Sequence, residues 1–366
     1  MEQLTTDIKY FKSLTGLRVI AAYMVFCHHY DVINIDLFGT QIHDFFREFH
    51  VGVTIFFVLS GFLITHRYYH LPKINFKNYL LNRFARLYPM YFLITTISFV
   101  VFGLIKYQEA FNNVWIYLLN ISFLRGFFED YKFSGVAQGW SLTVEEVFYL
   151  IAPLCFVIIK KNKLFLLILP IFTLALGFIL VSIFQNSSFY SFMSSINFML
   201  DFTFFGRCFE FFIGMTVAIF IDKFPYRLKY STYFGLVSTI IFIYLLSIIK
   251  LDTQSYGSDT LFGKIINTLL LPLFGIAPLL LGLIKEKTFI SKILSTNLFQ
   301  VLGKSSYIFY LIHLGIFVNV INKISHNYVV LFLSLNIISV LLYYTLELPL
   351  NNFLKQYFKT TKKSLF

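Results

Sequence analysis

The chain has 366 residues, of which 58% are hydrophobic and only 13% are charged. Soluble domains are about 45–50% apolar and about 25% charged, so a soluble globule of this composition would lack the polar surface that it needs. The composition therefore excludes an ordinary soluble enzyme, a disulfide-rich secreted scaffold and a disordered chain. It predicts an all-α polytopic membrane protein with room for about ten transmembrane helices.

Apolar runs mark where these helices are expected. The runs are 16–34, 50–66, 88–105, 140–159, 164–184, 206–222, 231–250, 261–284, 303–322 and 328–348. Residues 106–139 contain only a short apolar piece, Val114–Leu124, which is too short to cross a bilayer of about 30 Å and is expected to be interfacial or re-entrant. We expect a single membrane domain over 1–366, with an N-terminal tail over 1–15 and a basic C-terminal tail over 351–366.

Charge predicts the orientation of these helices. The formal net charge is +12, which in a soluble protein would suggest nucleic-acid binding. Here most basic residues fall in every second loop, as cytoplasmic loops require under the positive-inside rule. We therefore expect both termini in the cytoplasm and no nucleic-acid partner. Arg207 and Lys264 are exceptions, because both lie inside predicted spans.

The first predicted span carries two polar side chains eleven positions apart, Arg18 and His29. On an α-helix this spacing gives about 1100° of rotation and about 16.5 Å of rise, so both share one face. A cation at one end and an imidazole deeper on the same stripe suit an anionic donor whose reactive end meets a general base. The alternative is a snorkelling Arg18 and a packed His29. His28 points about 100° away from His29, so we expect no metal site.

The fourth predicted span begins with an acidic and aromatic segment, WSLTVEEVFY at 140–149. Glu145 and Tyr149 are four positions apart and share a helix face. Glu145 is a candidate to orient a histidine or to accept a hydroxyl proton, although acids also favour a helix N-terminus through the helix dipole. Trp140 is suited to stacking on a sugar ring or to the aromatic belt at the membrane surface.

Charged and imidazole side chains recur at the ends of later spans. Arg83 and Arg86, three positions apart, are candidates for phosphate binding, or for ordinary cytoplasmic charge. His313 lies about ten residues into the ninth span, and Glu347 ends the tenth.

Taken together and in order, these segments resemble the acyltransferase-3 family of integral membrane acyltransferases, over essentially the whole chain. The matching segments are LTGLRVIAAYMVFCHHY with its Arg-x10-His signature, GVTIFFVLSGFLIT at 52–65, RFARLYP at 83–89, WSLTVEEVFYL at 140–150 and LGKSSYIFYLIH at 302–313. The chain looks like the standalone form of the family, without a C-terminal SGNH-type esterase domain.

The resemblance implies a multi-pass enzyme of the bacterial inner membrane. It would transfer an acetyl or other acyl group from cytoplasmic acetyl-CoA, a co-substrate rather than a bound cofactor, to a hydroxyl of a cell-surface polysaccharide. Such an acceptor would be lipopolysaccharide O-antigen or its lipid-linked precursor. The alternative is a polytopic glycan transporter or flippase, or an O-antigen polymerase. A transporter is disfavoured because no internal repeat is evident.

The resemblance also implies roles for individual residues. Arg18, Arg83 and Arg86 would hold the phosphates of acyl-CoA. His29, oriented or assisted by Glu145, would be the general base on the acceptor hydroxyl, or would itself carry the acyl group. Substrate-binding or supporting residues would be Ser60, Trp140, Tyr149, Tyr307 and His313.

Overall fold

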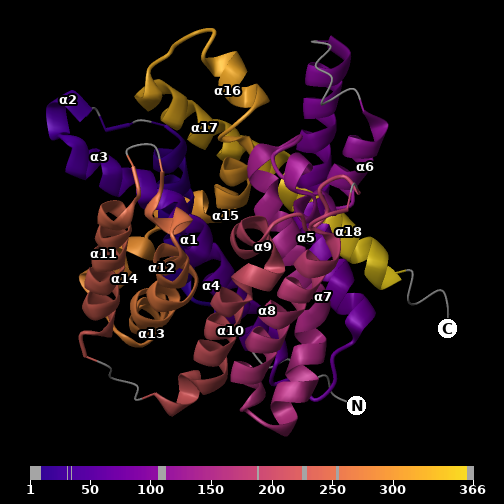
Figure 1. The fold of residues 1–366 in the computed structure, drawn as a ribbon, viewed down its shortest axis with the longest axis vertical. Coiled ribbons are helices and arrows are strands. Elements are labelled where there is room, and N and C mark those ends of the chain that lie inside the picture. The colour runs from indigo at the N-terminus through magenta and orange to yellow at the C-terminus, as the bar shows by residue number, and fades with distance from the viewer. Residues whose placement is uncertain are drawn as a thin grey trace.

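Helices make up the regular secondary structure of the part of the chain that the structure describes (Figure 1). The computed structural model describes residues 10–30, 32–33, 35–105, 113–187, 189–224, 229–252 and 255–360. The α-helices are α1 Lys12–His29, α2 Ile35–Phe38, α3 Thr40–Arg47, α4 Gly52–Tyr68, α5 Phe76–Phe99, α6 Val114–Ile121, α7 Trp140–Lys161, α8 Phe165–Phe184, α9 Ile196–Phe202, α10 Phe204–Phe220, α11 Ser231–Ile249, α12 Leu261–Ile265, α13 Ala277–Lys285, α14 Phe289–Leu294, α15 Asn297–Ile312, α16 Ile316–Ile321, α17 Tyr328–Leu342 and α18 Leu348–Thr360. Short 3-10 and π-helical segments join several of them.

Eight helical segments of the described chain are long and apolar enough to cross a membrane. They are Thr40–Tyr68, Phe76–Gly103, Ala137–Lys161, Phe165–Phe184, Ile196–Lys223, Ser231–Ile249, Leu261–Lys285 and Tyr328–Phe358. The prediction of an all-α polytopic membrane protein is therefore confirmed. The first and ninth predicted spans form helices that fall short of these limits. Helix α1 holds Lys12, Arg18 and two histidines, which lower its mean hydropathy, and α15 ends after 16 residues.

Helix α4 lies at the centre of the bundle, packed against α1 on one side and α10 on another. Glycines allow the second contact. A Cβ atom at Gly61 of α4 would lie 2.1 Å from the carbonyl oxygen of Phe211, and one at Gly214 of α10 would lie 2.1 Å from that of Val58. Small residues let membrane helices approach backbone to backbone. Helix α4 therefore packs backbone to backbone against α10.

The ninth predicted span is wrong as a continuous helix over 303–322. Helix α15 ends at Ile312, His313 caps it, and α16 starts only at Ile316. Gly315 between them has a φ of 87° and ψ of −135°, a region of backbone space that is essentially reserved for glycine. The break places His313 at the end of a helix rather than in the middle of a span.

Other boundaries also differ from expectation. Helix α1 ends at His29 although the apolar run continues to 34, and it begins at Lys12, inside the predicted tail 1–15. The predicted tail 351–366 is helical as far as Thr360. Residues 1–9 and 361–366 of the two tails lie outside the described residues. Helix α6 has 8 residues and is too short to cross a bilayer, as expected for the segment 106–139.

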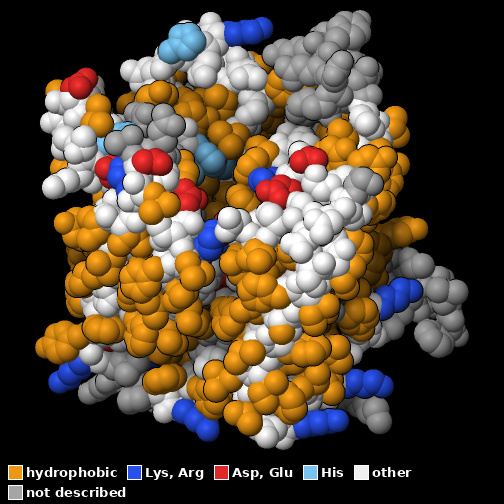
Figure 2. All heavy atoms as spheres, in the orientation of Figure 1, with side chains coloured by type: hydrophobic (Ala, Val, Ile, Leu, Met, Phe, Trp, Pro, Cys, Tyr) orange, Lys and Arg blue, Asp and Glu red, His pale blue; other side chains and the backbone are white. Residues whose placement is uncertain are grey.

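The two ends of the bundle differ in charge. Figure 2 shows Lys and Arg side chains along the lower edge of the molecule, whereas Asp, Glu and His side chains gather around a hollow in the upper half. Figure 1 places the N-terminus at the lower end. Helix ends and loops contact each other here: Lys160 Nζ at the end of α7 donates to the carbonyl oxygen of Leu71 at 2.7 Å, and the ring of Phe11 lies 5.1 Å from that of His66 near the end of α4.

Candidate active site

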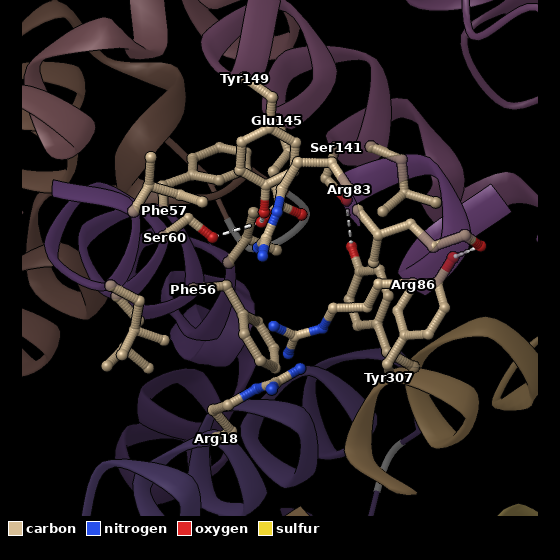
Figure 3. Close-up of a pocket in the computed structure, with 17 residues that line it drawn as sticks. Arg18, Phe56, Phe57, Ser60, Arg83, Arg86, Ser141, Glu145, Tyr149 and Tyr307 are labelled. Atoms are coloured by element: carbon tan, nitrogen blue, oxygen red, sulfur yellow. Dashed lines mark hydrogen bonds between the residues drawn. The ribbon is translucent and has the colours of Figure 1, made fainter. Parts of the chain in front are cut away.

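Five helices bring seven of the ten predicted site residues to one cavity. Its lining includes Arg18 from α1, Ser60 from α4, Arg83 and Arg86 from α5, Glu145 and Tyr149 from α7, and Tyr307 from α15. We call this cavity the arginine–glutamate chamber. Figure 3 shows the guanidinium ends of the three arginines converging in its middle, facing the Ser60–Glu145 hydrogen bond. Residues up to 289 positions apart in sequence thus share one polar space inside an apolar bundle.

Two of the three arginines, Arg83 and Arg86, come from the same helix. Arg83 and Arg86 lie one turn apart on α5, so both project from one face of the helix. Arg83 is buried, and its guanidinium carbon lies 5.9 Å from the ring centre of Tyr149 and 6.0 Å from that of Tyr68. Its Nε has no hydrogen-bond partner among the described residues. A buried cation with an unused donor is well prepared for an anionic ligand.

Glu145 is held by two hydroxyl groups. Ser60 Oγ and Tyr149 Oη both donate to Glu145 Oε1. The predicted contact between Glu145 and Tyr149 on one helix face is thereby confirmed. The Glu145 carboxylate is therefore held from α4 and α7 at the same time. Elsewhere in the chamber, Tyr307 Oη donates to the carbonyl oxygen of Leu87 at 2.8 Å, so its hydroxyl is anchored to α5.

A basic mouth opens onto this chamber. Two overlapping cavities of about 350 and 500 Å³ share Arg18, Arg83 and Arg86 with the arginine–glutamate chamber. Further cations line them: Lys12, Arg67, Lys304 and Lys355. Glu347 lies in the same mouth, buried, with one oxygen unpartnered within the described chain. The mouth has the size and charge to bind a polyanion.

His29 and Trp140 line a second cavity, which we call the histidine chamber. Its volume is about 330 Å³ and it lies at the other end of α1, where His29 is exposed to it. Its other lining residues include His28, His50, Phe133, Gln138, Asp201, Phe202, Tyr256, Ser258, Asp259 and Tyr310. Aromatic rings beside carboxylate and amide groups form a surface that suits a polyhydroxylated ligand.

His313 lies beside His29. The two imidazole rings are 5.2 Å apart between centroids. His313 is fully buried, its Nδ1 is 2.7 Å from the carbonyl oxygen of Tyr310, and its Nε2 has no hydrogen-bond partner within the described residues. Tyr30 Oη donates to the carbonyl oxygen of His313 at 2.5 Å. The helix break after Ile312 therefore positions a second imidazole beside the predicted base.

The structure does not form the expected pairing between Glu145 and His29. Glu145 lines the arginine–glutamate chamber, with Ser60 and Tyr149, whereas His29 lines the histidine chamber. The reason is the length of α1: Arg18 lies three turns from His29, and the carboxylate is at the level of the arginine. His28 does not leave His29, although its predicted direction suggested that it would: the two ring centroids are 4.7 Å apart and both residues line the histidine chamber, with His28 Nδ1 2.6 Å from the carbonyl oxygen of Arg47.

Sequence reasoning missed two ion pairs beside the histidine chamber, which Arg207 of one pair and Asp201 of the other line. Arg207 binds Glu210 at 2.6 Å, and its Nη2 also donates to Thr54 Oγ1 at 3.0 Å. Lys264 binds Asp201 at 2.5 Å. The signal was present, because Arg207 and Lys264 are the cations that break the charge rule by lying inside predicted spans.

Comparison with known proteins places this geometry in a family. A family model described as an acyltransferase domain matches residues 11–348. The chain therefore belongs to the acyltransferase-3 family of membrane proteins, as its motifs indicated.

Curated relatives match shorter stretches of the chain. Peptidoglycan O-acetyltransferase OatA of Listeria monocytogenes is 28% identical over 171 residues, which cover 42% of this chain and 25% of the relative. Putative peptidoglycan O-acetyltransferase YrhL of Bacillus subtilis is 29% identical over 43% of this chain and 25% of its own length. O-acetyltransferase OatA of Staphylococcus aureus is 28% identical over 40% and 24%. The match thus spans about a quarter of these relatives. No solved structure matches the chain.

Proposed function

We propose that this protein is a membrane O-acetyltransferase. It takes an acetyl group from acetyl-CoA in the cytoplasm and transfers it to a hydroxyl of a cell-surface glycan or its lipid-linked precursor. The observation that carries the proposal is the series of cavities from the basic mouth, through the arginine–glutamate chamber, to the histidine chamber. Neighbouring cavities share lining residues: Arg18, Arg83 and Arg86 at one junction, and Val53 and Tyr310 at the other.

The basic mouth supports an acyl-CoA donor. Arginines bind phosphate oxygens through charge-assisted and bidentate hydrogen bonds, and the three arginines share the mouth with four further cations. With the phosphates there, the thioester arm extends along α1 toward His29, over a rise of about 16.5 Å. The protein would then lie in a bacterial inner membrane, with the basic end of the bundle facing the cytoplasm, in agreement with the positive-inside rule.

His29 acts on the acceptor hydroxyl in the histidine chamber. Its neutral imidazole takes the hydroxyl proton while the hydroxyl oxygen attacks the thioester carbonyl carbon. The carbon–sulfur bond then breaks, and the protonated imidazole returns the proton to the departing CoA sulfur. His313, 5.2 Å away, supports the His29 ring from behind. In the covalent variant, His29 first accepts the acetyl group and then passes it to the hydroxyl.

The chemistry of the histidine chamber supports a glycan acceptor. Trp140, Phe202 and Tyr256 offer apolar ring surfaces, and Asp201 and Asp259 offer hydroxyl acceptors. Two of the relatives named above are called peptidoglycan O-acetyltransferases, one of them a putative one, whereas O-antigen was the acceptor expected from the resemblance. Both belong to the proposed acceptor class.

Acetyl transfer to isolated glycans tests the proposal. Membranes that contain the wild-type chain or His29→Ala, at matched expression, receive radiolabelled acetyl-CoA together with O-antigen, its lipid-linked precursor or peptidoglycan. We expect label in an alkali-labile ester on one acceptor with wild type, and none with His29→Ala. Absence of label on every acceptor would favour the glycan transporter instead. Equal labelling by both proteins would remove His29 from the chemistry.

A further inference from the structure

The histidine chamber is lined by a further imidazole that the reaction described above does not use. His50 belongs to the short 3-10 helix Glu48–Val51, which leads into α4. The ring centroid of His28 lies 5.4 Å from that of His50 and 4.7 Å from that of His29. All three histidines line the chamber. His50 therefore lies in the space that is proposed for the acceptor.

The carboxylate of Glu48 holds the His50 ring. Glu48 Oε2 lies 2.9 Å from His50 Nε2, and Glu48 Oε1 accepts a hydrogen bond from the backbone N–H of Gly257 at 2.7 Å. The Glu48 side chain is 2% exposed, whereas that of His50 is 20% exposed. A carboxylate that accepts from one imidazole nitrogen keeps the proton on that nitrogen and leaves the lone pair on the other. We call these two residues the Glu48–His50 dyad.

A contact with Ser258 shows which nitrogen of His50 is left for a ligand. Ser258 Oγ lies 3.1 Å from His50 Nε2, the same nitrogen that faces Glu48. In a serine triad the hydroxyl and the carboxylate bind opposite ring nitrogens, so Ser258 is not an activated nucleophile here. Both hydrogen-bond contacts of the His50 ring with the described residues are at Nε2. Nδ1 is therefore the nitrogen that can accept from a molecule in the chamber.

His29 has no such acidic partner. Within the described chain, the rings beside it include those of His28 and His313, and no carboxylate is hydrogen-bonded to it. A carboxylate stabilises a protonated imidazole, whereas neighbouring imidazoles do not. The surroundings of His29 thus suit a neutral nucleophile, and the Glu48–His50 dyad suits a group that takes up a proton.

Other groups of the chamber that could take up a proton have different partners. Asp201 binds Lys264 at 2.5 Å, and Asp259 Oδ2 accepts from the backbone N–H of Tyr256 at 2.7 Å. His28 contacts a backbone carbonyl group and not a carboxylate. Among the described residues that line the chamber, His50 is therefore the imidazole that a carboxylate binds.

We propose that His50, held by Glu48, is the general base for the acceptor hydroxyl when His29 carries the acetyl group. The inference rests on the proposed function and favours its covalent variant. Once a His29 nitrogen is bonded to the acetyl group, that nitrogen cannot take the hydroxyl proton, so the second step requires another base. His50 lies in the same chamber and supplies one.

The two imidazoles then divide the reaction between them. In the first step, a His29 nitrogen attacks the thioester carbonyl carbon, the carbon–sulfur bond breaks, and the proton of the other His29 nitrogen goes to the CoA sulfur. In the second step, the acceptor oxygen attacks the acetyl carbonyl carbon while His50 Nδ1 takes the hydroxyl proton. The carbon–nitrogen bond breaks, and the proton passes from His50 to the departing His29 imidazole. Both rings end neutral, as they began, and His50 is needed only in the second step.

Exchange between CoA and acetyl-CoA separates the two steps. Membranes that contain the full-length protein receive unlabelled acetyl-CoA and radiolabelled CoA without a glycan, so label in acetyl-CoA reports the first step in both directions. Glycan acetylation, measured as above, reports both steps. His50→Gln keeps an amide that can contact Glu48 but cannot act as a base. We expect its exchange to persist and its glycan acetylation to fall by about 10²–10⁴-fold, whereas His29→Ala should lose both.

His70→Gln is the matched control, because His70 is an exposed histidine outside the cavities described above. It should keep both exchange and acetylation. Glu48→Gln provides a second test, since its amide oxygen can still accept from His50 Nε2 but carries no charge to stabilise the protonated ring. It should lower glycan acetylation and retain exchange, and it decides the matter if His50→Gln fails to fold.

Several results would overturn the role of His50. Glycan acetylation at the wild-type rate in His50→Gln is one, and a loss found in His28→Gln alone is another, because the base would then be His28. Loss of exchange in His50→Gln with an unchanged thermal midpoint would place His50 in the first step instead.

Failure of this inference and failure of the proposed function give different results. Wild-type protein that acetylates a glycan without any exchange transfers the acetyl group directly from the thioester. That result keeps the proposed function and overturns the role of His50. Wild-type protein that shows neither exchange nor acetylation of any glycan contradicts the proposed function itself.

Discussion

His29 and Glu145 lie in separate chambers, and this separation predicts different roles for them. His29 is exposed to the cavity that suits the acceptor, with His313 behind it. Glu145 accepts hydrogen bonds from Ser60 and Tyr149 at the level of the arginines. Under the proposed function, His29 would touch the reacting hydroxyl, whereas Glu145 would shape the path of the donor.

Substitutions at the two positions should therefore behave differently. His29→Ala removes the proposed general base, and we expect the turnover rate to fall by about 10²–10⁴-fold with little change in acetyl-CoA affinity. Glu145→Gln keeps an oxygen that can accept from Ser60 and Tyr149, and we expect a loss in turnover below about 10-fold. Steady-state kinetics of glycan acetylation measure both. An equal collapse of turnover in Glu145→Gln would return Glu145 to the proton transfer.

The arginine cluster predicts a change in donor affinity. Hydrogen bonds to charged groups contribute about 1.5–3 kcal/mol each, so Arg86→Ala should raise the KM for acetyl-CoA by about 10- to 150-fold and leave turnover at saturation nearly unchanged. Lys73→Ala is the control, because Lys73 is an exposed cation that lies outside the cavities described above. A similar rise in KM for Lys73→Ala would mean that overall surface charge, and not the cluster, attracts the donor.

At the scale of elements, the break between α15 and α16 is the feature that a hydropathy pattern misses. The run 303–322 is mostly apolar, so its sequence reads as one span. The break depends on Gly315, whose unusual φ and ψ are invisible in composition, and on Tyr30, which binds the carbonyl group of His313 from 283 positions away. A helix that holds both Arg18 and His29, by contrast, was predictable, although it was expected over 16–34 and forms over Lys12–His29.

Gly315→Ala tests whether the break positions His313. The space beside Gly315 is open, so the substitution meets no steric clash, but its backbone conformation is strained for any residue with a Cβ atom by about 1–3 kcal/mol. We expect a lower thermal midpoint and reduced turnover. Gly39→Ala is a matched control, since Gly39 also has a positive φ of 78° and open space around it. It should lose stability but keep turnover. Equal turnover in both variants would show that the break is only structural.

At the scale of the whole molecule, the sequence predicted the class of fold and most of the polar site residues. It did not predict how these residues are distributed between two cavities. Four helices converge and bring together Arg18, Arg83, Glu145 and Tyr307. Such convergence depends on contacts between segments far apart in the chain. The apolar runs carry no information about it, since an apolar face packs against lipid and against protein equally well. The two chambers are therefore findings of the structure.

The direction of transfer depends on which end of the bundle faces the cytoplasm, and this gives a prediction for the whole molecule. Under the proposed function the donor would enter at the basic mouth, so the loop that follows α7 should be cytoplasmic and the loop that follows α8 should be external. Asn162→Cys and Asn186→Cys place thiols at exposed positions in these two loops, in a background with Cys27, Cys155 and Cys208 replaced by serine. On intact cells, an impermeant thiol reagent should label the Asn186→Cys protein, and the Asn162→Cys protein only after permeabilisation. Since CoA is confined to the cytoplasm, the reverse pattern would place the basic mouth outside and remove acyl-CoA as its ligand.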